Sequence, residues 1–110
     1  MDGWEAVCEF RQLREGRGLG VEVDGLGLAV FREGEAVHVL TARCPHANGP
    51  LDRGWIDGGE AVCPLHHWRF RLATGRCTSV GGYSVGRFEA EIRDGWVWAR
   101  LGSPGLRARC

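Results

Sequence analysis

Two short segments, each with one cysteine and one histidine, constrain this chain more than any other feature. They are Cys44-Pro-His46 and Cys63-Pro-Leu-His66, with sixteen residues between His46 and Cys63. Thiolate and imidazole both bind transition metals, so the four side chains predict a metal site at the tips of two neighbouring loops. A zinc site is one interpretation, although zinc motifs more often pair cysteine with cysteine and histidine with histidine. The mixed pairs suit a two-iron cluster in which the cysteines bind one iron and the histidines bind the other.

The residues around these ligands resemble the Rieske-type [2Fe–2S] proteins. The first cluster loop of that family is similar to segment 44–51, which reads Cys-Pro-His-Ala-Asn-Gly-Pro-Leu. The second is similar to segment 63–76, which reads Cys-Pro-Leu-His-His-Trp-Arg-Phe-Arg-Leu-Ala-Thr-Gly-Arg. Segment 54–61 fits the short hairpin that joins the two loops in this family. The specific resemblance covers residues 36–77, with weaker agreement of the strand pattern on both sides.

The resemblance implies one [2Fe–2S] cluster per chain, with Cys44 and Cys63 on the buried iron and His46 and His66 on the outer iron. High-potential members of the family carry two further cysteines joined by a disulfide. They also carry serine and tyrosine hydroxyls that hydrogen-bond to cluster sulfurs. This chain has other residues at those four places, namely Gly49, Leu65, Trp68 and Phe70. Fewer hydrogen bonds to sulfur lower the potential, so the resemblance implies the low-potential ferredoxin class, without a disulfide in the lobe.

The strand and turn pattern predicts an all-β fold. Eighteen glycines and few helical patterns favour short strands joined by tight turns. Asp24-Gly25 and Asp94-Gly95 are strong hairpin signals, and a third hairpin is predicted around Gly34. A helical turn is predicted within 9–14. We expect one domain, 1–110, with an antiparallel β-sandwich-like core, an inserted cluster-binding lobe at about 42–77 and a loose tail at 102–110.

Composition narrows the classes of function. The formal net charge is zero, which predicts no general attraction to nucleic acid. No apolar stretch approaches the roughly 20 residues that cross a bilayer, and the acidic start at residues 1–5 is unlike a secretion signal. We therefore expect a soluble, cytoplasmic protein that binds neither membrane nor nucleic acid. Cys8 and Cys77 are expected as small buried hydrophobic residues, and Cys110 as an exposed residue of the tail.

Three features near the predicted site have two interpretations each. Five arginines are either solvated side chains or a positive rim around the site: Arg43, Arg53, Arg69, Arg71 and Arg76. His67 stands where many relatives have glycine, and is either a solvated loop residue or a titrating neighbour of the cluster. Segment 80–84 corresponds to a third loop that shields the cluster in the family and is often proline-rich. Here it contains no proline, so its shielding role stays open.

The function that the resemblance implies is one-electron transfer. A soluble Rieske ferredoxin would pass electrons from a flavin reductase to a terminal oxygenase. The chain shows no second metal motif and no dinucleotide fingerprint, so we expect an electron-transfer protein with no catalytic residues of its own. One alternative is the small subunit of an NAD(P)H-dependent nitrite reductase, whose partner would be the large subunit. Another is a zinc-stabilised interaction module.

Overall fold

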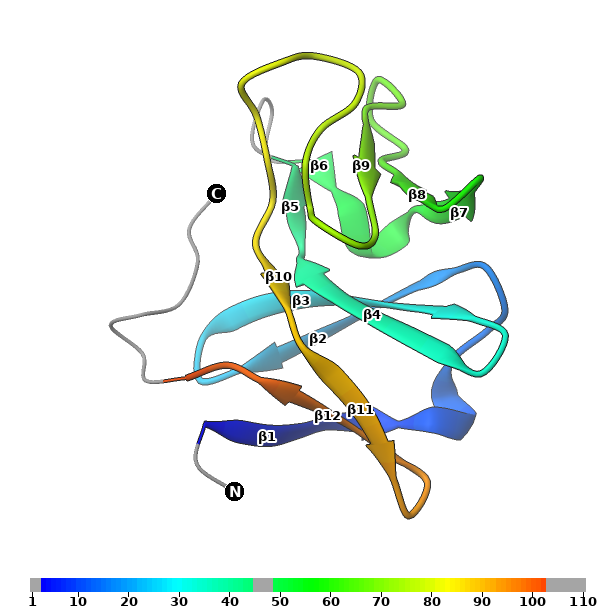
Figure 1. The fold of residues 1–110 in the computed structure, drawn as a ribbon, viewed down its shortest axis with the longest axis vertical. Helices are drawn as coiled ribbons and strands as arrows, with labels where there is room; N and C mark the ends of the chain where they lie inside the picture. Colours follow the sequence, from blue (N-terminus) through cyan, green and yellow to red (C-terminus); the bar gives the residue numbers. More distant parts are fainter. Residues whose placement is uncertain (1–2, 45–48, 103–110) are drawn as a thin grey trace.

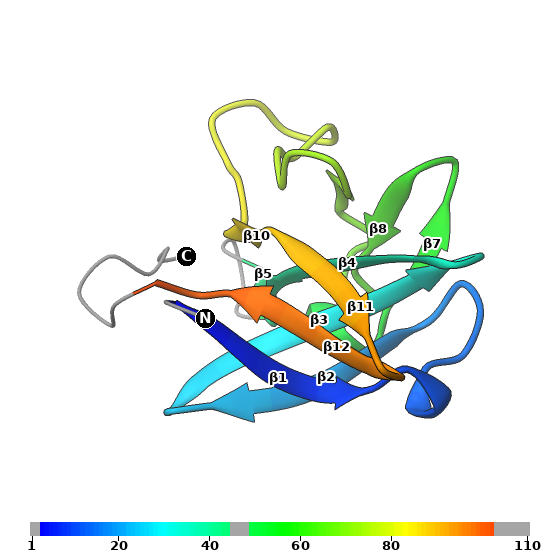
Figure 2. The same ribbon diagram turned by 60° about the horizontal axis from the view of Figure 1, so that its bottom comes forward.

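The computed structural model describes residues 3–44 and 49–102, which form two stacked sheets and a smaller lobe (Figure 1). The first sheet has the order β1-β12-β11, formed by Trp4–Glu9, Trp96–Arg100 and Ala90–Arg93. The second has the order β10-β4-β3-β2, formed by Arg87–Phe88, Ala36–Thr41, Leu26–Glu33 and Gly18–Val23. Neighbouring strands in both sheets are antiparallel, and Figure 2 shows one sheet lying over the other. The predicted all-β sandwich is confirmed.

The predicted hairpins are present because their turn residues adopt the required backbone. Asp24 and Gly25, between β2 and β3, have φ angles of 50° and 81°. Asp94 and Gly95, between β11 and β12, have φ angles of 50° and 80°. Two successive positive φ values are the requirement of the tight hairpin turn that matches the twist of the flanking strands. Gly34, with φ of 63°, lies in the turn between β3 and β4.

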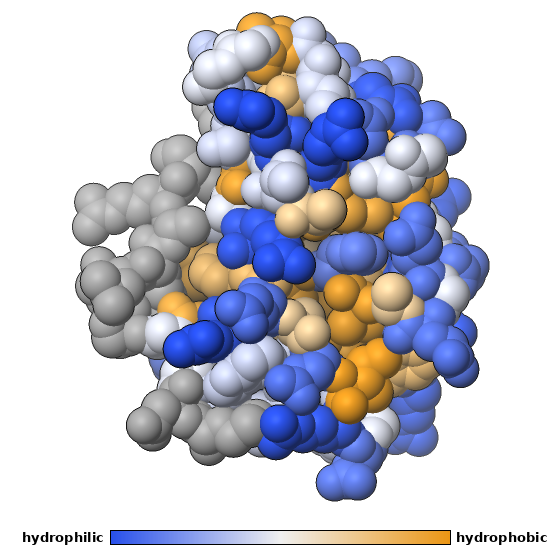
Figure 3. All heavy atoms as spheres, in the orientation of Figure 1, coloured by the Kyte–Doolittle hydropathy of each residue, from blue (hydrophilic) through white to orange (hydrophobic). Residues whose placement is uncertain are grey.

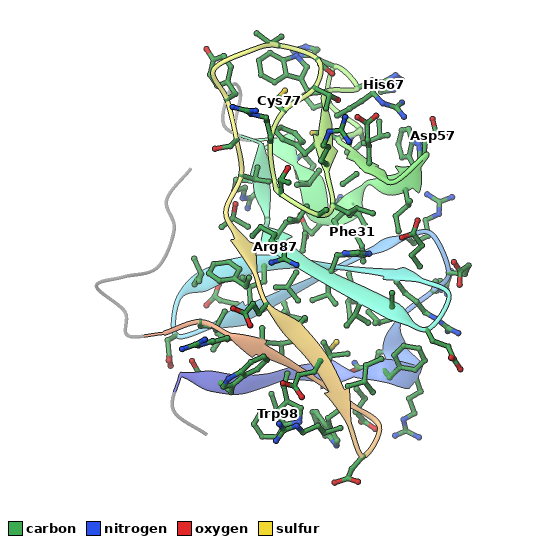
Figure 4. All side chains as sticks on the ribbon, viewed as in Figure 1. Phe31, Asp57, His67, Cys77, Arg87 and Trp98 are labelled. Carbon is green, nitrogen blue, oxygen red and sulfur yellow. The ribbon has the colours of Figure 1, made fainter. Side chains whose placement is uncertain are left out.

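Strand β3 is buried on both of its faces, which fixes where the lobe sits. Leu28, Ala29, Val30 and Phe31 are four successive residues with 0% exposure. Because side chains alternate along a strand, Leu28 and Val30 join the core between the two sheets, whereas Ala29 and Phe31 join the core beneath the lobe. Figure 4 shows Phe31 at this boundary between the sheet and the lobe. The lobe therefore packs on the outer face of the second sheet.

The lobe lies between β4 and β10 in the sequence. It contains a two-stranded and a three-stranded sheet, formed by β5 (Arg43–Cys44), β6 (Gly49–Pro50), β7 (Trp55–Asp57), β8 (Glu60–Val62) and β9 (Arg69–Arg71). The chain then returns along β9, with an isolated bridge between Phe70 and Cys77. Segment 78–84 therefore packs with the lobe, beyond the region expected from the sequence.

Helical structure in the described residues is limited to two 3₁₀ turns, η1 (Phe10–Gln12) and η2 (Leu51–Arg53). The first lies inside the predicted helical turn and is closed by reciprocal bonds between Glu9 and Gln12. Neither described turn has the length or the apolar character needed to cross a membrane. Cys8 and Cys77 are buried with free thiols, as expected, and burial raises the pKa of the Cys8 thiol to about 11.

Candidate metal centre

Cys63 is the best-defined of the four predicted ligands. It follows β8, has 0% exposure, and its thiol is free. Its backbone N–H donates to the carbonyl of Trp68 at 2.8 Å, which closes the loop between them. Cys63 belongs to the same apolar cluster as Phe70 and Cys77. The Cys63 thiol therefore lies in the core of the lobe, on a loop closed by a backbone hydrogen bond.

The structure joins the two predicted ligand segments through Gly49. In the ladder of β5 and β6, Cys44 is the partner of Gly49. A Cβ atom built on Gly49 would lie 2.9 Å from Sγ of Cys63 and 3.1 Å from Cβ of Leu65. Only a glycine fits this approach, so the backbone beside Cys44 lies directly against the Cys63 sulfur. The same contact makes positions 49 and 65 neighbours, as the resemblance implied, and neither residue can form a disulfide.

His66 and His67 lie at the surface on an unusual backbone. Both side chains are exposed, and their φ angles are 64° and 56°. Two consecutive non-glycine residues in the left-handed region cost about 1–3 kcal/mol each, and such conformations cluster at functional sites. The turn directs His66 outward while Cys63, three residues earlier, stays buried. The His67 ring meets the edge of Trp55 at a centroid distance of 5.6 Å; Figure 4 shows where His67 lies on the lobe.

The remaining predicted ligands are placed only in part. The backbone of Cys44 is described, but its side chain and all of His46 lie outside the described residues. Within residues 3–44 and 49–102, no three His, Cys, Asp or Glu side chains gather as metal ligands. The described donors, a buried thiol and an exposed imidazole on one short loop, still fit a mixed sulfur and nitrogen site.

The third loop packs on the lobe despite having no proline. Tyr83 lies edge-on to Trp68, with ring centroids 5.1 Å apart, and its carbonyl accepts from the N–H of Cys77 at 3.0 Å. The N–H of Val80 points to Sγ of Cys77 at 3.4 Å. The Ser79 hydroxyl accepts from the N–H of Arg69 at 2.9 Å. Bonds to Arg69 and Cys77 and the ring contact with Trp68 therefore attach this segment to the lobe.

The tip of the lobe exposes apolar side chains from these two loops. Leu65, Val80 and Tyr83 are 37%, 40% and 43% exposed. Figure 3 shows a small hydrophobic area at the top of the molecule, bordered by side chains of intermediate hydropathy with hydrophilic ones beyond them. A small apolar area with a polar surround is typical of the centre of a transient protein contact.

Arg69 is committed to an ion-pair network inside the lobe. Its guanidinium binds Glu60 at 2.6 Å and Asp57 at 2.8 Å. A hydrogen bond from Thr78, followed by the one from Arg69, lowers the pKa of the Glu60 carboxyl. The bond to Glu60, followed by the one to Asp57, raises the pKa of Arg69. Of the two interpretations of the arginines, Arg69 supports neither, because its charge is neutralised within the lobe.

This network predicts a pH-dependent stability. A carboxyl whose pKa is lower in the folded than in the unfolded protein stabilises the fold when it is ionised. For Glu60 this stabilisation is fully present above the unfolded pKa, near the ordinary value of 4.5. It is lost as the pH falls through the folded pKa. Glu60→Gln should therefore lower the thermal midpoint at pH 7, and the difference from wild type should shrink below about pH 4.5. Glu91→Gln, which removes an exposed pair with Arg93, is the control. A difference that is constant from pH 7 to pH 3.5 would contradict this role of Glu60.

Comparison with known proteins identifies relatives of this chain. A family model described as the Rieske [2Fe-2S] domain matches residues 3–85. The oxygenase component of a 3-ketosteroid-9-alpha-monooxygenase from Rhodococcus rhodochrous is 39% identical over 79 residues, which cover 71% of this chain and 21% of the relative. The chain spans about a quarter or less of the length of the curated relatives that it matches first.

Two solved structures are similar over most of their own length. The ferredoxin of carbazole 1,9a-dioxygenase from Nocardioides aromaticivorans IC177 has a TM-score of 0.81 at 28% identity, covering 89% of this chain and 97% of that one. A Mycobacterium tuberculosis protein described as an NADH-dependent nitrite reductase small subunit has a TM-score of 0.81 at 27% identity, covering 90% and 95%. The family match and the fold agree, and the chain belongs to the Rieske [2Fe-2S] domain family.

Proposed function

We propose that this chain holds one [2Fe–2S] cluster through Cys44, His46, Cys63 and His66. The observation that carries the proposal is the contact between Gly49 and Cys63, because it joins the two segments that supply the ligands. The zinc alternative lacks comparable support, since the matching family is named for the iron–sulfur cluster. The single domain, 1–110, with its tail at 102–110, is part of the same proposal.

Of the proposed ligands, Cys63 is buried in the lobe and His66 is exposed at its surface. When bound, a [2Fe–2S] cluster takes up and releases one electron. Cys63, with 0% exposure, would bind on the protein side, where the apolar core keeps water out. His66 is exposed, so its imidazole edge would lie where a partner protein approaches. Burial of the thiolate and exposure of the imidazole suit electron exchange through the histidine side.

We further propose that the chain carries electrons from a flavin reductase to a terminal oxygenase, as an electron-transfer protein with no catalytic residues of its own. The similar ferredoxin of carbazole dioxygenase supports this role. The similar nitrite reductase small subunit keeps a nitrite reductase large subunit as the alternative acceptor. The two functions are distinguished by mixing the reduced protein with each type of acceptor under anaerobic conditions. Only the true acceptor should reoxidise the protein at a rate at least as fast as that acceptor's catalytic turnover.

The cluster itself is tested by analysis of natively purified protein. We expect two irons and two acid-labile sulfides per chain and a red-brown oxidised form. Colorimetric iron and sulfide determination, with zinc measured in the same sample, gives the result. Stoichiometric zinc without sulfide would contradict the proposal and favour a zinc-stabilised module.

A second candidate function follows from the curated relatives. The 39% identity to a 3-ketosteroid-9-alpha-monooxygenase oxygenase component exceeds the 27–28% identity to the two similar solved structures above. The chain would then act as the electron-accepting domain of a steroid oxygenase. An antibody against this chain distinguishes the two in extracts of its source. A band near 12.1 kDa supports a separate carrier, whereas a band between three and four times larger supports the oxygenase.

A further inference from the structure

A hollow on the flank of the molecule is lined by side chains that include two guanidinium groups and no carboxylate. Its volume is about 360 Å³, and it is lined by Gln12, Arg14, Arg17, Gly18 and Leu19. None of these residues is acidic. Two guanidinium groups and one amide around an open space form a suitable site for a carboxylate.

The charges of this hollow are not neutralised within the described part of the chain. Arg14 and Arg17 are exposed, and neither forms an ion pair with a described residue. Glu15 lies between them in sequence, but both its carboxylate oxygens accept from the N–H of Gly34 at 2.9 Å. The Gln12 side-chain oxygen already accepts from the N–H of Glu9 at 2.8 Å, so its amide group remains to donate. The hollow therefore offers positive charge and donors to an external anion.

A line of side chains connects this hollow to the second ligand loop. Arg17 and Trp55 face each other in an antiparallel bridge. The neighbouring bonds, from Gly18 N–H to the Gly54 carbonyl and from Ile56 N–H to the Gly16 carbonyl, make them a non-hydrogen-bonded pair. Side chains of such a pair lie close together on one face. Trp55 in turn contacts the ring of His67, the residue after His66.

We propose that Arg14, Arg17, Trp55 and His67 form a docking face for an acidic segment of a redox partner, with a carboxylate of that segment bound in the hollow. This proposal deepens the electron-carrier function and rests on it. Arginine and aromatic side chains are enriched at protein contacts. Since the whole chain has no net charge, attraction of an acidic partner must come from local groups such as these. The face would orient the partner beside the exposed imidazole of His66.

The binding step is tested with a fluorescein-labelled octaglutamate peptide and the cluster-loaded protein at low salt. The test variant is Arg14→Gln/Arg17→Gln. The control, Arg93→Gln/Arg100→Gln, removes the same charge from β11 and β12 in the opposite sheet. Fluorescence anisotropy should show about tenfold weaker binding for the test variant and less than about twofold for the control. Equal losses in both variants, or no binding by the wild type, would overturn the proposal.

The link to electron transfer is tested with two small oxidants of opposite charge. Each takes one electron from the reduced protein: ferricyanide is an anion, and tris(phenanthroline)cobalt(III) is a cation. Stopped-flow oxidation by ferricyanide should slow several-fold in Arg14→Gln/Arg17→Gln, whereas oxidation by the cobalt complex should not slow. A ferricyanide rate equal to that of the wild type would overturn the assigned position of the face. Failure of the wild-type cluster to assemble would instead contradict the proposed function, because assembly depends on the proposed ligands and not on Arg14 or Arg17.

Discussion

Cys63→Ala is expected to yield a folded but colourless protein without bound iron or sulfide. The thiol is fully buried beside Gly49, so solvent cannot take its place as a ligand. Loss of a thiolate also leaves the ferric charge uncompensated in an apolar core. Visible absorbance together with iron and sulfide analysis measures the loss.

The chain supplies matched controls for this result. Cys77→Ala truncates another buried cysteine of the same apolar core. This variant should still bind the [2Fe–2S] cluster. His66→Ala and His67→Ala form a second pair, because both residues are exposed and both have positive φ. Only His66→Ala should prevent normal assembly. Equal cluster loss in Cys77→Ala, or in His67→Ala, would show that local packing rather than ligation determines the outcome.

Gly49→Ala should destabilise the lobe and reduce cluster content. The added Cβ would lie 2.9 Å from Sγ of Cys63 and 3.1 Å from Cβ of Leu65, closer than ordinary contacts. Overpacking of this kind costs about 1–3 kcal/mol, and here the displaced atom is a proposed metal ligand. Thermal unfolding and the iron content per chain report the two effects.

Gly81→Ala is the control for this substitution. A Cβ at Gly81 meets no atom within 4 Å, and its φ is not in the left-handed region, so the change should be nearly neutral. If Gly49→Ala were as stable and as iron-rich as Gly81→Ala, the close approach of Gly49 to Cys63 would be wrong. The proposed joining of the two ligand segments would then lose its main support.

The sequence predicted those parts of the fold that depend on local chemistry. Asp24-Gly25 and Asp94-Gly95 specified their turns because few other dipeptides accept two positive φ values. The ligand set was proposed from residue types and spacing alone, and the structure places Cys63 and His66 on one loop as expected. His67 is exposed, in agreement with a solvated loop residue, although its contact with Trp55 was not foreseen.

Sequence patterns could not predict structural features that depend on contacts between distant residues. The run Leu28–Phe31 does not reveal that its two faces serve different cores. The third loop lacks proline, and its attachment depends on Trp68, Cys77 and Ser79 from another part of the lobe. The sequence could not decide whether the arginines are solvated side chains or a positive rim around the site. The ion pairs of Arg69 with Asp57 and Glu60 cross the β7-β8-β9 sheet, so they depend on contacts between strands.

The most direct test of the central claim is the ligand environment of the iron in the reduced protein. Electron–nuclear double resonance of protein labelled with ¹⁵N-histidine would detect nitrogen bound to the cluster. We expect strong coupling from two histidines in the wild type and the same two couplings in His67→Ala. A signal without histidine coupling, as from a cluster held only by cysteine, would contradict the assignment of His46 and His66.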